Sequence, residues 1–402
     1  MSDRIGVGMV GYAFMGKAHS QAWRNVHRFF DPPLTPDLAA LCGRDRQRAT
    51  AAAATLGWAH VETDWRALVD RDDVQLVDVC TPGDSHAEIA LAALAAGKHV
   101  LCEKPLSNSV AEAEEMTAAA ERAAANGVVA MVGFNYRRVP AIALARELVR
   151  SGRIGDVRHV RALYLQDWIV DPQFPLVWRL QRDKAGSGAL GDIGAHIVDL
   201  AQYVTGELIA GVSAQTETFV RERPLPAESA GLAADSNGSG TGVVTVDDCA
   251  LFTARLTGGG MATFEATRFA TGRKNAMRLE VNGSLGSIAF DFESMNELHF
   301  HDDTEPATTA GFRRILVTEP EHPYLSAWWP AGHGLGYEHA FTHQAYDLLT
   351  AVAGDGIVHP TFRDGLQVQR VLDAVERSAA DGSRFTAVAG LDLVEPAAVV
   401  TT

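Results

Sequence analysis

A glycine-rich turn near the start of the chain constrains the fold more than any other feature of the sequence. The apolar run Ile5–Val10 leads directly into Gly11-Tyr12-Ala13-Phe14-Met15-Gly16, and a helix-forming stretch follows. A strand, a glycine turn and a helix in this order are typical of a dinucleotide fingerprint, although Ala13 replaces its middle glycine. Small residues let the backbone and the helix N-terminus approach a pyrophosphate. The predicted contacts with NAD or NADP are Gly11, Ala13, Phe14, Met15 and Gly16.

The pattern that follows this turn predicts a doubly wound α/β domain. Short β-branched runs alternate with alanine-rich stretches over the first third of the chain. This alternation is typical of βαβ units around a parallel sheet. We expect the resulting Rossmann domain to occupy residues 1–134. Its expected strands are 5–10, 38–42, 76–80, 99–102 and 128–132.

The remaining residues, 135–402, follow a different pattern. Segments between residues 157 and 300 alternate apolar and polar side chains and are separated by glycine-rich turns. This predicts a large, mainly antiparallel open sheet with helices on one face, in an α+β domain for substrate binding and oligomerisation. Residues 226–242 are predicted to form a mobile surface insertion, and the chain to end in a frayed tail. Helices are expected at 140–151, 190–205, 337–353 and 363–381.

Composition and charge exclude several classes of partner. The 402 residues, 47% of them hydrophobic, are typical of a globular protein with more than one domain. A net charge of −15 opposes binding to nucleic acid or to an anionic membrane. No segment has the pattern of a membrane span or a secretory signal. The cysteines form no CxxC pair or Cys/His cluster, which predicts reduced thiols in a cytoplasmic protein and no metal site. They are Cys42, Cys80, Cys102 and Cys249.

The end of the second expected strand bears on the choice between NAD and NADP. An acidic residue there favours the ribose of NAD, and a basic residue favours the 2′-phosphate of NADP. The chain reads Gly43-Arg44-Asp45 at this point. Arg44 is a candidate to pair with a phosphate or to lie on the adenine, while Asp45 is within reach of a ribose. The residues alone leave both cofactors open.

Three further motifs identify a family resemblance. They are Thr81-Pro82-Gly83-Asp84-Ser85-His86, Glu103-Lys104-Pro105 and Gly191-Asp192-Ile193-Gly194-Ala195-His196. Their order and spacing resemble the Gfo/Idh/MocA oxidoreductases over nearly the whole chain. Four more segments resemble the members of that family that oxidise the anhydrosugar levoglucosan. These are Tyr164–Trp168, Trp178–Arg179, Gly186–Asp192 and Glu265–Arg268.

The resemblance implies an NAD(P)-dependent dehydrogenase that oxidises a secondary hydroxyl of a sugar, an anhydrosugar or a cyclic polyol. It leans toward NAD and implies a homodimer or homotetramer, which an exposed face of the second sheet would suit. Inositol oxidation, keto-sugar reduction and a non-catalytic dinucleotide-sensing regulator are the alternatives. A regulator of this fold lacks the catalytic lysine or histidine, and both are present here. Further cofactor contacts are expected at Thr81, Pro82, His86 and Glu103, with His86 packing near the cofactor.

Oxidation of an alcohol requires a base beside the nicotinamide. Lys104 follows a strand at the edge where such sheets bind ligands. Asp192 and His196 are four residues apart, so a helix would place both on one face. The resemblance implies that all three are catalytic, with His196 as the main proton acceptor or relay and Asp192 orienting substrate and imidazole. Which group formally takes the proton stays open.

Substrate recognition is expected to involve polar side chains that face the cleft in the resembling family. Sugar binding requires directed hydrogen bonds and aromatic surfaces. Trp168 and Trp178 are candidates for the aromatic surfaces, and the alternative is that they pack in the core. The aromatic and glycine-rich stretch 323–337 is either a lid or an oligomer contact. The predicted substrate contacts are Lys104, Tyr136, Gln166, Trp168, Arg179, Asp192 and His196.

Overall fold

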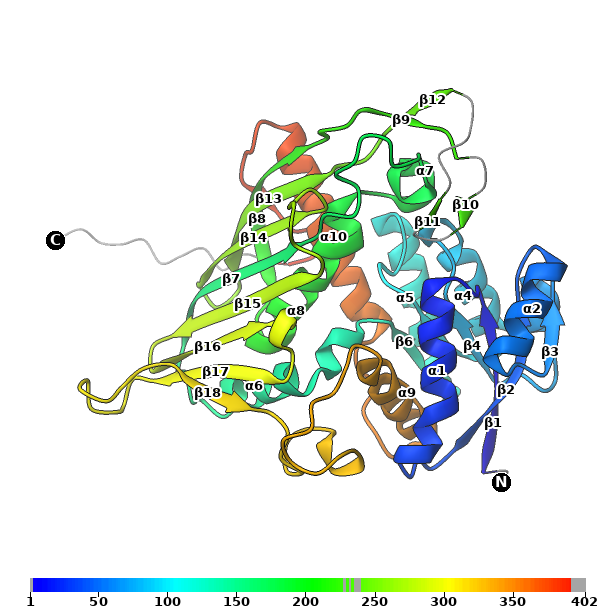
Figure 1. The fold of residues 1–402 in the computed structure, drawn as a ribbon, viewed down its shortest axis with the longest axis horizontal. Helices are drawn as coiled ribbons and strands as arrows, with labels where there is room; N and C mark the ends of the chain where they lie inside the picture. Colours follow the sequence, from blue (N-terminus) through cyan, green and yellow to red (C-terminus); the bar gives the residue numbers. More distant parts are fainter. Residues whose placement is uncertain (1–2, 227–228, 231–232, 235–239, 392–402) are drawn as a thin grey trace.

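The computed structural model describes residues 3–226, 229–230, 233–234 and 240–391, and Figure 1 shows two sheets with helices packed between and around them. The first sheet has six parallel strands in the order β3-β2-β1-β4-β5-β6. This confirms the predicted doubly wound domain. The strands are β1 (Arg4–Val10), β2 (Thr35–Cys42), β3 (His60–Glu62), β4 (Leu76–Val79), β5 (His99–Cys102) and β6 (Ala130–Val132).

Side-chain caps begin two of the helices that cover the first sheet. Asp45 and Ser109 accept hydrogen bonds from backbone N–H groups in the first turns of α2 and α5, which satisfies donors that a helix leaves unpaired. The sequence analysis missed β3, because three half-exposed residues at a sheet edge give no clear periodicity. The helices are α1 (Phe14–Phe29), α2 (Arg46–Leu56), α3 (Trp65–Val69), α4 (His86–Ala95) and α5 (Val110–Ala124).

The second sheet has nine strands in the order β18-β17-β16-β15-β7-β14-β13-β8-β19. Buried and exposed residues alternate along strands such as β13, so one face is apolar. All its pairs are antiparallel except β7 with β14, which confirms the prediction of a mainly antiparallel sheet. The strands are β7 (Val157–Leu165), β8 (Ile209–Glu217), β13 (Cys249–Leu256), β14 (Met261–Thr267), β15 (Ala276–Gly283), β16 (Gly286–Asp291), β17 (Glu297–Asp302), β18 (Arg313–Leu316) and β19 (Thr386–Ala387).

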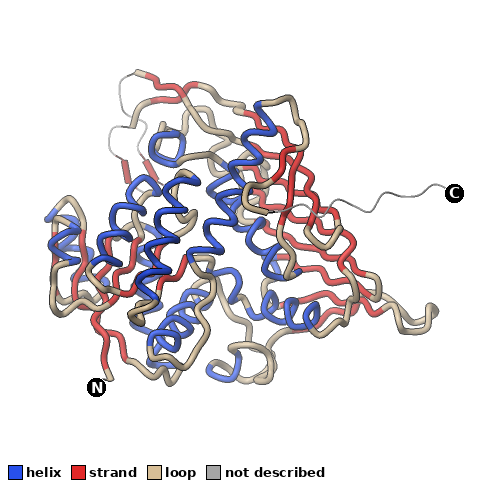
Figure 2. The backbone as a smooth tube through the Cα atoms, turned by 180° about the vertical axis from the view of Figure 1, so that it is seen from behind, coloured by secondary structure: helices blue, strands red, loops and turns tan. Residues whose placement is uncertain are grey.

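Three helices cover the apolar face of this sheet. They are α6 (Pro140–Arg150), α8 (Ala195–Thr205) and α10 (Phe362–Ala380), and Figure 2 shows helices lining one side of the large sheet. The predicted helix at 190–205 begins with a π-helical turn, Leu190–Gly194, before α8. A π turn is rare and recurs at functional sites.

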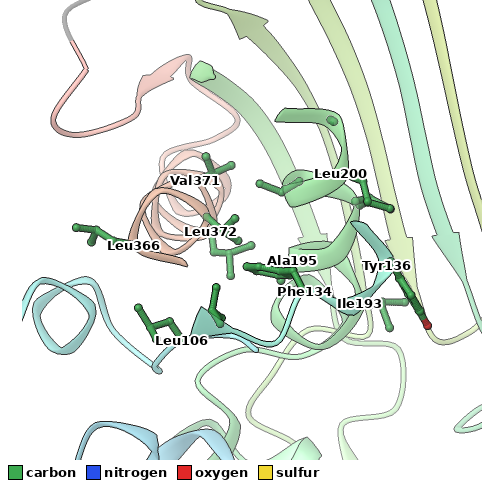
Figure 3. Close-up of a cluster of buried hydrophobic side chains, with 14 of the residues drawn as sticks. Leu106, Phe134, Tyr136, Ile193, Ala195, Leu200, Leu366, Val371 and Leu372 are labelled. Atoms are coloured by element: carbon green, nitrogen blue, oxygen red, sulfur yellow. The ribbon is translucent and has the colours of Figure 1, made fainter. Parts of the chain in front are cut away.

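A central cluster of apolar side chains joins the two halves of the molecule. Figure 3 shows side chains from the segment after β6, from α8 and its π turn, and from α10 meeting there. Phe134, Tyr136 and Ile193 are all at least 96% buried. Because Tyr136 and Ile193 belong to this cluster, their positions are fixed by packing.

The C-terminal part of the chain returns to the first sheet. Helix α9 (His339–Val352) packs against α1, and its Phe341, Leu348 and Leu349 share a core with Trp23. Figure 1 shows the two helices side by side. The division at residue 134 stays a prediction, since part of 135–402 covers the dinucleotide-binding half.

Two sequence predictions concern residues that the structure does not fully describe. Residues 227–228, 231–232 and 235–239 of the expected insertion lie outside the described residues, as does the expected tail, 392–402. On either side of the insertion, β9 (Glu222–Pro224) pairs with β12 (Thr241–Val243).

Two further sequence features can be compared with the structure, namely the state of the cysteines and the length and polarity of the helices. The four cysteines are free thiols, three of them buried and Cys249 half-buried. Across the described ranges, every helix is too short or too polar to cross a membrane.

Leu348→Ala tests the packing of α9 on the first sheet. Leu348 is fully buried, so the truncation should lower the free energy of unfolding by about 2–5 kcal/mol. Urea denaturation followed by far-UV circular dichroism measures this change. Ile357→Ala is the control, because Ile357 is 80% exposed and its loss should change stability by less than about 0.5 kcal/mol. Equal effects in the two variants would contradict the assigned packing.

Candidate active site

A cavity of about 470 Å³ lies at the carboxyl edge of the first sheet, facing the second domain. The carboxyl ends of β1, β4 and β5 lead into three of its walls, as expected for a ligand site in a doubly wound fold. Of the predicted site residues, the cavity lining includes Ala13, Phe14, Met15, Thr81, Pro82, His86, Glu103, Lys104, Tyr136, Gln166, Trp168, Arg179, Asp192 and His196.

The turn after β1 has the shape that a dinucleotide pyrophosphate requires. Gly11 has a φ of 103°, and a Cβ there would lie 2.7 Å from the carbonyl oxygen of Cys80. A Cβ on Gly16 would lie 2.3 Å from the carbonyl oxygen of Gly11. Ala13 precedes α1 with a φ of −73°, so its methyl group causes no strain. Gly11 and Gly16 therefore shape the turn, while Ala13, Phe14 and Met15 reach the cavity, and this cradle fits a dinucleotide.

The residues after β2 do not reach the cavity. The Asp45 carboxylate accepts a hydrogen bond of 2.9 Å from the backbone N–H of Arg48 and so caps α2. Arg44 is exposed and does not line the cavity. Its expected contact with the adenosine end of a cofactor stays a prediction.

Lys104 and Asp192 meet across the boundary between the two halves. The Lys104 ammonium donates a hydrogen bond of 2.6 Å to the backbone carbonyl of Asp192 and lies 3.7 Å from its carboxylate. Arg268 and Arg179 approach the same carboxylate at 3.5 and 3.9 Å. Burial raises the pKa of Asp192, but Lys104 and the two arginines outweigh it and lower the pKa to about 2. Asp192 is therefore ionised at neutral pH.

His196 lies one turn further along the chain and is buried against an aromatic ring. Its imidazole is 93% buried, and its ring centroid is 4.5 Å from that of Tyr136. Burial, and next the Lys104 ammonium, hold the pKa of His196 well below its usual value. Within the part of the chain that the structure describes, its buried Nδ1 has no hydrogen-bond partner. At neutral pH the imidazole is uncharged and able to accept a proton.

The wall opposite the dinucleotide turn carries a chain of hydrogen bonds. The Tyr136 and Tyr164 hydroxyls are 2.9 Å apart, and Tyr164 and Gln166 donate to the side-chain oxygen of Asn275 at 2.7 and 2.8 Å. The Trp168 indole donates to Gln166 at 3.1 Å. Polar groups and an indole along one wall are what sugar recognition requires.

Arg179 and Trp178 also line this cavity, and they stack on each other. The Arg179 guanidinium lies 4.3 Å from the centroid of the Trp178 ring. The stacking holds the arginine beside Asp192 without a bidentate ion pair. Trp178 thus belongs to the cavity wall and is not a residue of the apolar core.

His86 and Glu103 support the cavity from the first domain. The His86 ring nitrogens lie 2.9 Å from the carbonyl oxygens of Pro105 and Thr81, so the ring links the turns after β4 and β5. Glu103 accepts a hydrogen bond of 2.9 Å from His19. His86 thus bridges two turns at the cavity, and its expected place near the cofactor stays a prediction.

A buried charged cluster lies behind Glu103 and was missed by the sequence analysis. Among the described residues, the side chains of His19, Asp78 and Cys80 lie close enough together to hold a metal ion. Asp78 and Cys80 outweigh burial and raise the pKa of His19 well above its usual value. The His19 ring nitrogens lie 3.0 Å from the Asp78 carboxylate and 2.9 Å from that of Glu103, so the protonated imidazole forms a buried ion pair with both.

Sequence reasoning also missed several residues of the cavity wall. Asn275 comes from the segment before β15, which pairs with β7, and no local pattern in the sequence indicates this contact. Tyr337 closes the stretch 323–337 and stacks on Phe14, with ring centroids 6.1 Å apart. Further missed residues of the lining are Gly83, Pro105, Asn108, Asn135, Tyr164, Ala185, Ser187, Ile193 and Lys274.

The stretch 323–337 packs against the first domain. Trp328 lies with its ring 4.4 Å from that of Phe29, and it donates a hydrogen bond of 2.7 Å to His343 of α9. Through Tyr337 the stretch reaches the cavity. The choice between a lid and an oligomer contact stays open.

Comparisons with known proteins agree with this geometry. Residues 5–134 match the family described as an oxidoreductase family with an NAD-binding Rossmann fold, and residues 142–289 match the GFO/IDH/MocA C-terminal domain. The chain is 42% identical over 385 residues to levoglucosan dehydrogenase of Pseudarthrobacter phenanthrenivorans, covering 95% of this chain and 97% of the relative.

Two solved structures are similar over almost the whole chain. An oxidoreductase domain protein from Kribbella flavida is 65% identical with a TM-score of 0.92, covering 96% of this chain and all of the other. Levoglucosan dehydrogenase in complex with NADH and levoglucosan is 39% identical with a TM-score of 0.89, with the same coverage.

The protonation of His196 responds to its two charged neighbours in opposite directions. Lys104→Met removes a cation and should raise the pKa of His196, whereas Asp192→Asn removes an anion and should lower it further. Titration of the imidazole by NMR with labelled histidine measures both. Shifts in the same direction would contradict the assigned environment of His196.

Proposed function

This chain belongs to the Gfo/Idh/MocA family of oxidoreductases, and we propose that it is an NAD-dependent dehydrogenase of anhydrosugars. Its substrate is a levoglucosan-type sugar, of which it oxidises a secondary hydroxyl to the keto form. The observation that carries this proposal is the meeting of Lys104, Asp192 and His196 in the cavity that the dinucleotide turn borders. The 42% identity to a levoglucosan dehydrogenase supports the choice of substrate.

The chemistry divides between the cofactor and the side chains. When bound, NAD⁺ would supply the acceptor for the hydride that leaves the carbon bearing the hydroxyl. His196, neutral at physiological pH, accepts or relays the hydroxyl proton. Lys104 donates a hydrogen bond to the substrate oxygen, and Asp192 holds the Lys104 ammonium and orients the substrate. In the reverse direction the same groups return the proton, so the protein also reduces the keto sugar.

Binding follows the same division. We propose that residues 1–134 hold the cofactor through the turn Gly11–Gly16 and the residues Thr81, Pro82, His86 and Glu103. Residues 135–402 supply the sugar contacts Tyr136, Gln166, Trp168 and Arg179. Exposed apolar residues on the second sheet, Leu251 and Met261, support its use as a homodimer or homotetramer contact. The free thiols, three of them buried, support a cytoplasmic location.

Removal of the proposed proton-transfer groups should abolish turnover and preserve cofactor binding. Lys104→Ala and His196→Ala should each lower kcat by about 10²–10⁴-fold, because each removes a group that acts on the hydroxyl proton. Absorbance of NADH during oxidation of levoglucosan, inositols and hexoses measures the rate, and fluorescence titration measures NADH binding. Lys98→Ala is the control, since Lys98 hydrogen-bonds to Val74 at the opposite edge of the sheet. Near-normal activity of Lys104→Ala would refute the assignment, and NADH binding without oxidation of any sugar would favour the regulator.

The same assay decides the cofactor. We expect a higher kcat/KM with NAD⁺ than with NADP⁺, since the levoglucosan dehydrogenase structures contain NADH. Arg44→Ala should then change kcat/KM with NAD⁺ by less than about threefold, because a single exposed charge contributes little. A higher kcat/KM with NADP⁺, lost in Arg44→Ala, would instead assign Arg44 to a 2′-phosphate.

A further inference from the structure

The hydrogen-bond chain on the sugar-binding wall has one allowed direction. It starts at the Trp168 indole, whose N–H is a donor only. Because the Gln166 side-chain oxygen accepts this bond at 3.1 Å, the Gln166 NH₂ group faces the other way. That group donates to the Asn275 side-chain oxygen at 2.8 Å. The orientation of both amides therefore follows from the indole.

The direction continues through the two tyrosines. Tyr164 donates to the same oxygen of Asn275 at 2.7 Å, and a phenol has a single proton. The Tyr136 hydroxyl is 2.9 Å from that of Tyr164, so Tyr136 must be the donor of this bond. Its proton then points to Tyr164, so a ligand in the cavity meets only a lone pair of the Tyr136 hydroxyl.

Burial keeps this direction from being reversed by solvent. Tyr136 and Tyr164 are 96% and 97% buried. Burial also raises the pKa of Tyr136 to about 12, so its hydroxyl keeps its proton at neutral pH. The contact with the His196 ring holds Tyr136 at the cavity.

We propose that Asn275 is a positioning residue that fixes Tyr136 as a hydrogen-bond acceptor, so that the site selects a sugar hydroxyl that donates to Tyr136. This inference rests on the proposed sugar dehydrogenase function. A consequence is that Tyr136 does not supply a proton to the reaction, which leaves that step to Lys104 and His196.

Fluorinated sugars test the direction, because fluorine replaces a hydroxyl at similar size but has no proton to donate. The probes are levoglucosan and its fluorinated analogues. In each analogue, fluorine replaces one hydroxyl other than the one that is oxidised. For each position, the ratio of kcat/KM for the hydroxyl form to that for the fluorine form is measured with NAD⁺. Fluorine also slows hydride removal electronically, so ratios are compared between variants, where this effect cancels.

The wild type should prefer the hydroxyl about tenfold at the position that contacts Tyr136, because fluorine leaves the acceptor unpaired. Tyr136→Phe should remove this preference and so identify the position. Asn275→Leu should reduce the preference to near that of Tyr136→Phe. Without Asn275, the Tyr164 hydroxyl is free to donate to Tyr136, and the Tyr136 hydroxyl can then turn its own proton to the sugar. Asn275→Asp keeps the acceptor and should keep the preference. Asn126→Leu, at an exposed loop, is the matched control.

The outcomes separate the inference from the function. If Asn275 has a purely structural role, Asn275→Leu lowers turnover of the hydroxyl and fluorine sugars equally and leaves their ratio unchanged, which overturns the inference. The inference is also overturned if Tyr136→Phe changes the ratio at no position of the sugar. If Asn275→Leu loses its fold, judged by circular dichroism and NADH binding, Tyr164→Phe replaces it and should lower the same ratio. A wild type that oxidises no sugar refutes the proposed function and the inference together.

Discussion

The attraction between the Asp192 carboxylate and its three cationic neighbours is the contact on which the site depends. Lys104 comes from the end of a strand in the first domain, while Arg179 and Arg268 come from the second. A carboxylate so enclosed stays ionised, while burial and the Lys104 ammonium keep the nearby His196 neutral. One electrostatic arrangement thus joins the two halves of the molecule and sets the protonation states that alcohol oxidation needs.

The sequence predicted those features whose cause is local. The glycine turn and the strand ends that place Thr81 and Lys104 each follow from a few neighbouring residues, and the structure agrees with both. The spacing of Asp192 and His196 correctly indicated proximity, but not the π-helical turn that contains Asp192. A π turn differs from an α turn by one residue, which hydrophobic periodicity does not resolve.

The residues that the sequence did not predict come together through distant pairings. Asn275 reaches Gln166 because Ala276 of β15 lies opposite Leu165 of β7, more than a hundred residues away. His19 finds Asp78 and Glu103 only when α1 packs on the sheet. Tyr337 meets Phe14 because α9 returns to the first domain. In each case the register or the packing decides, and neither leaves a mark on the local sequence.

The one parallel pair in the second sheet has a consequence for how this site changes over evolution. Because β7 and β14 run in the same direction, with Leu165 beside Thr267, both strands end at the same edge of the sheet. The loops that carry Gln166, Trp168 and Arg268 therefore emerge next to each other, beyond the last bonds of the ladder. Substitutions and insertions after either strand alter one pocket while the framework beneath keeps its register. In this topology, a change of loop alters the contacts to a ligand without disturbing the hydrogen bonds of the sheet.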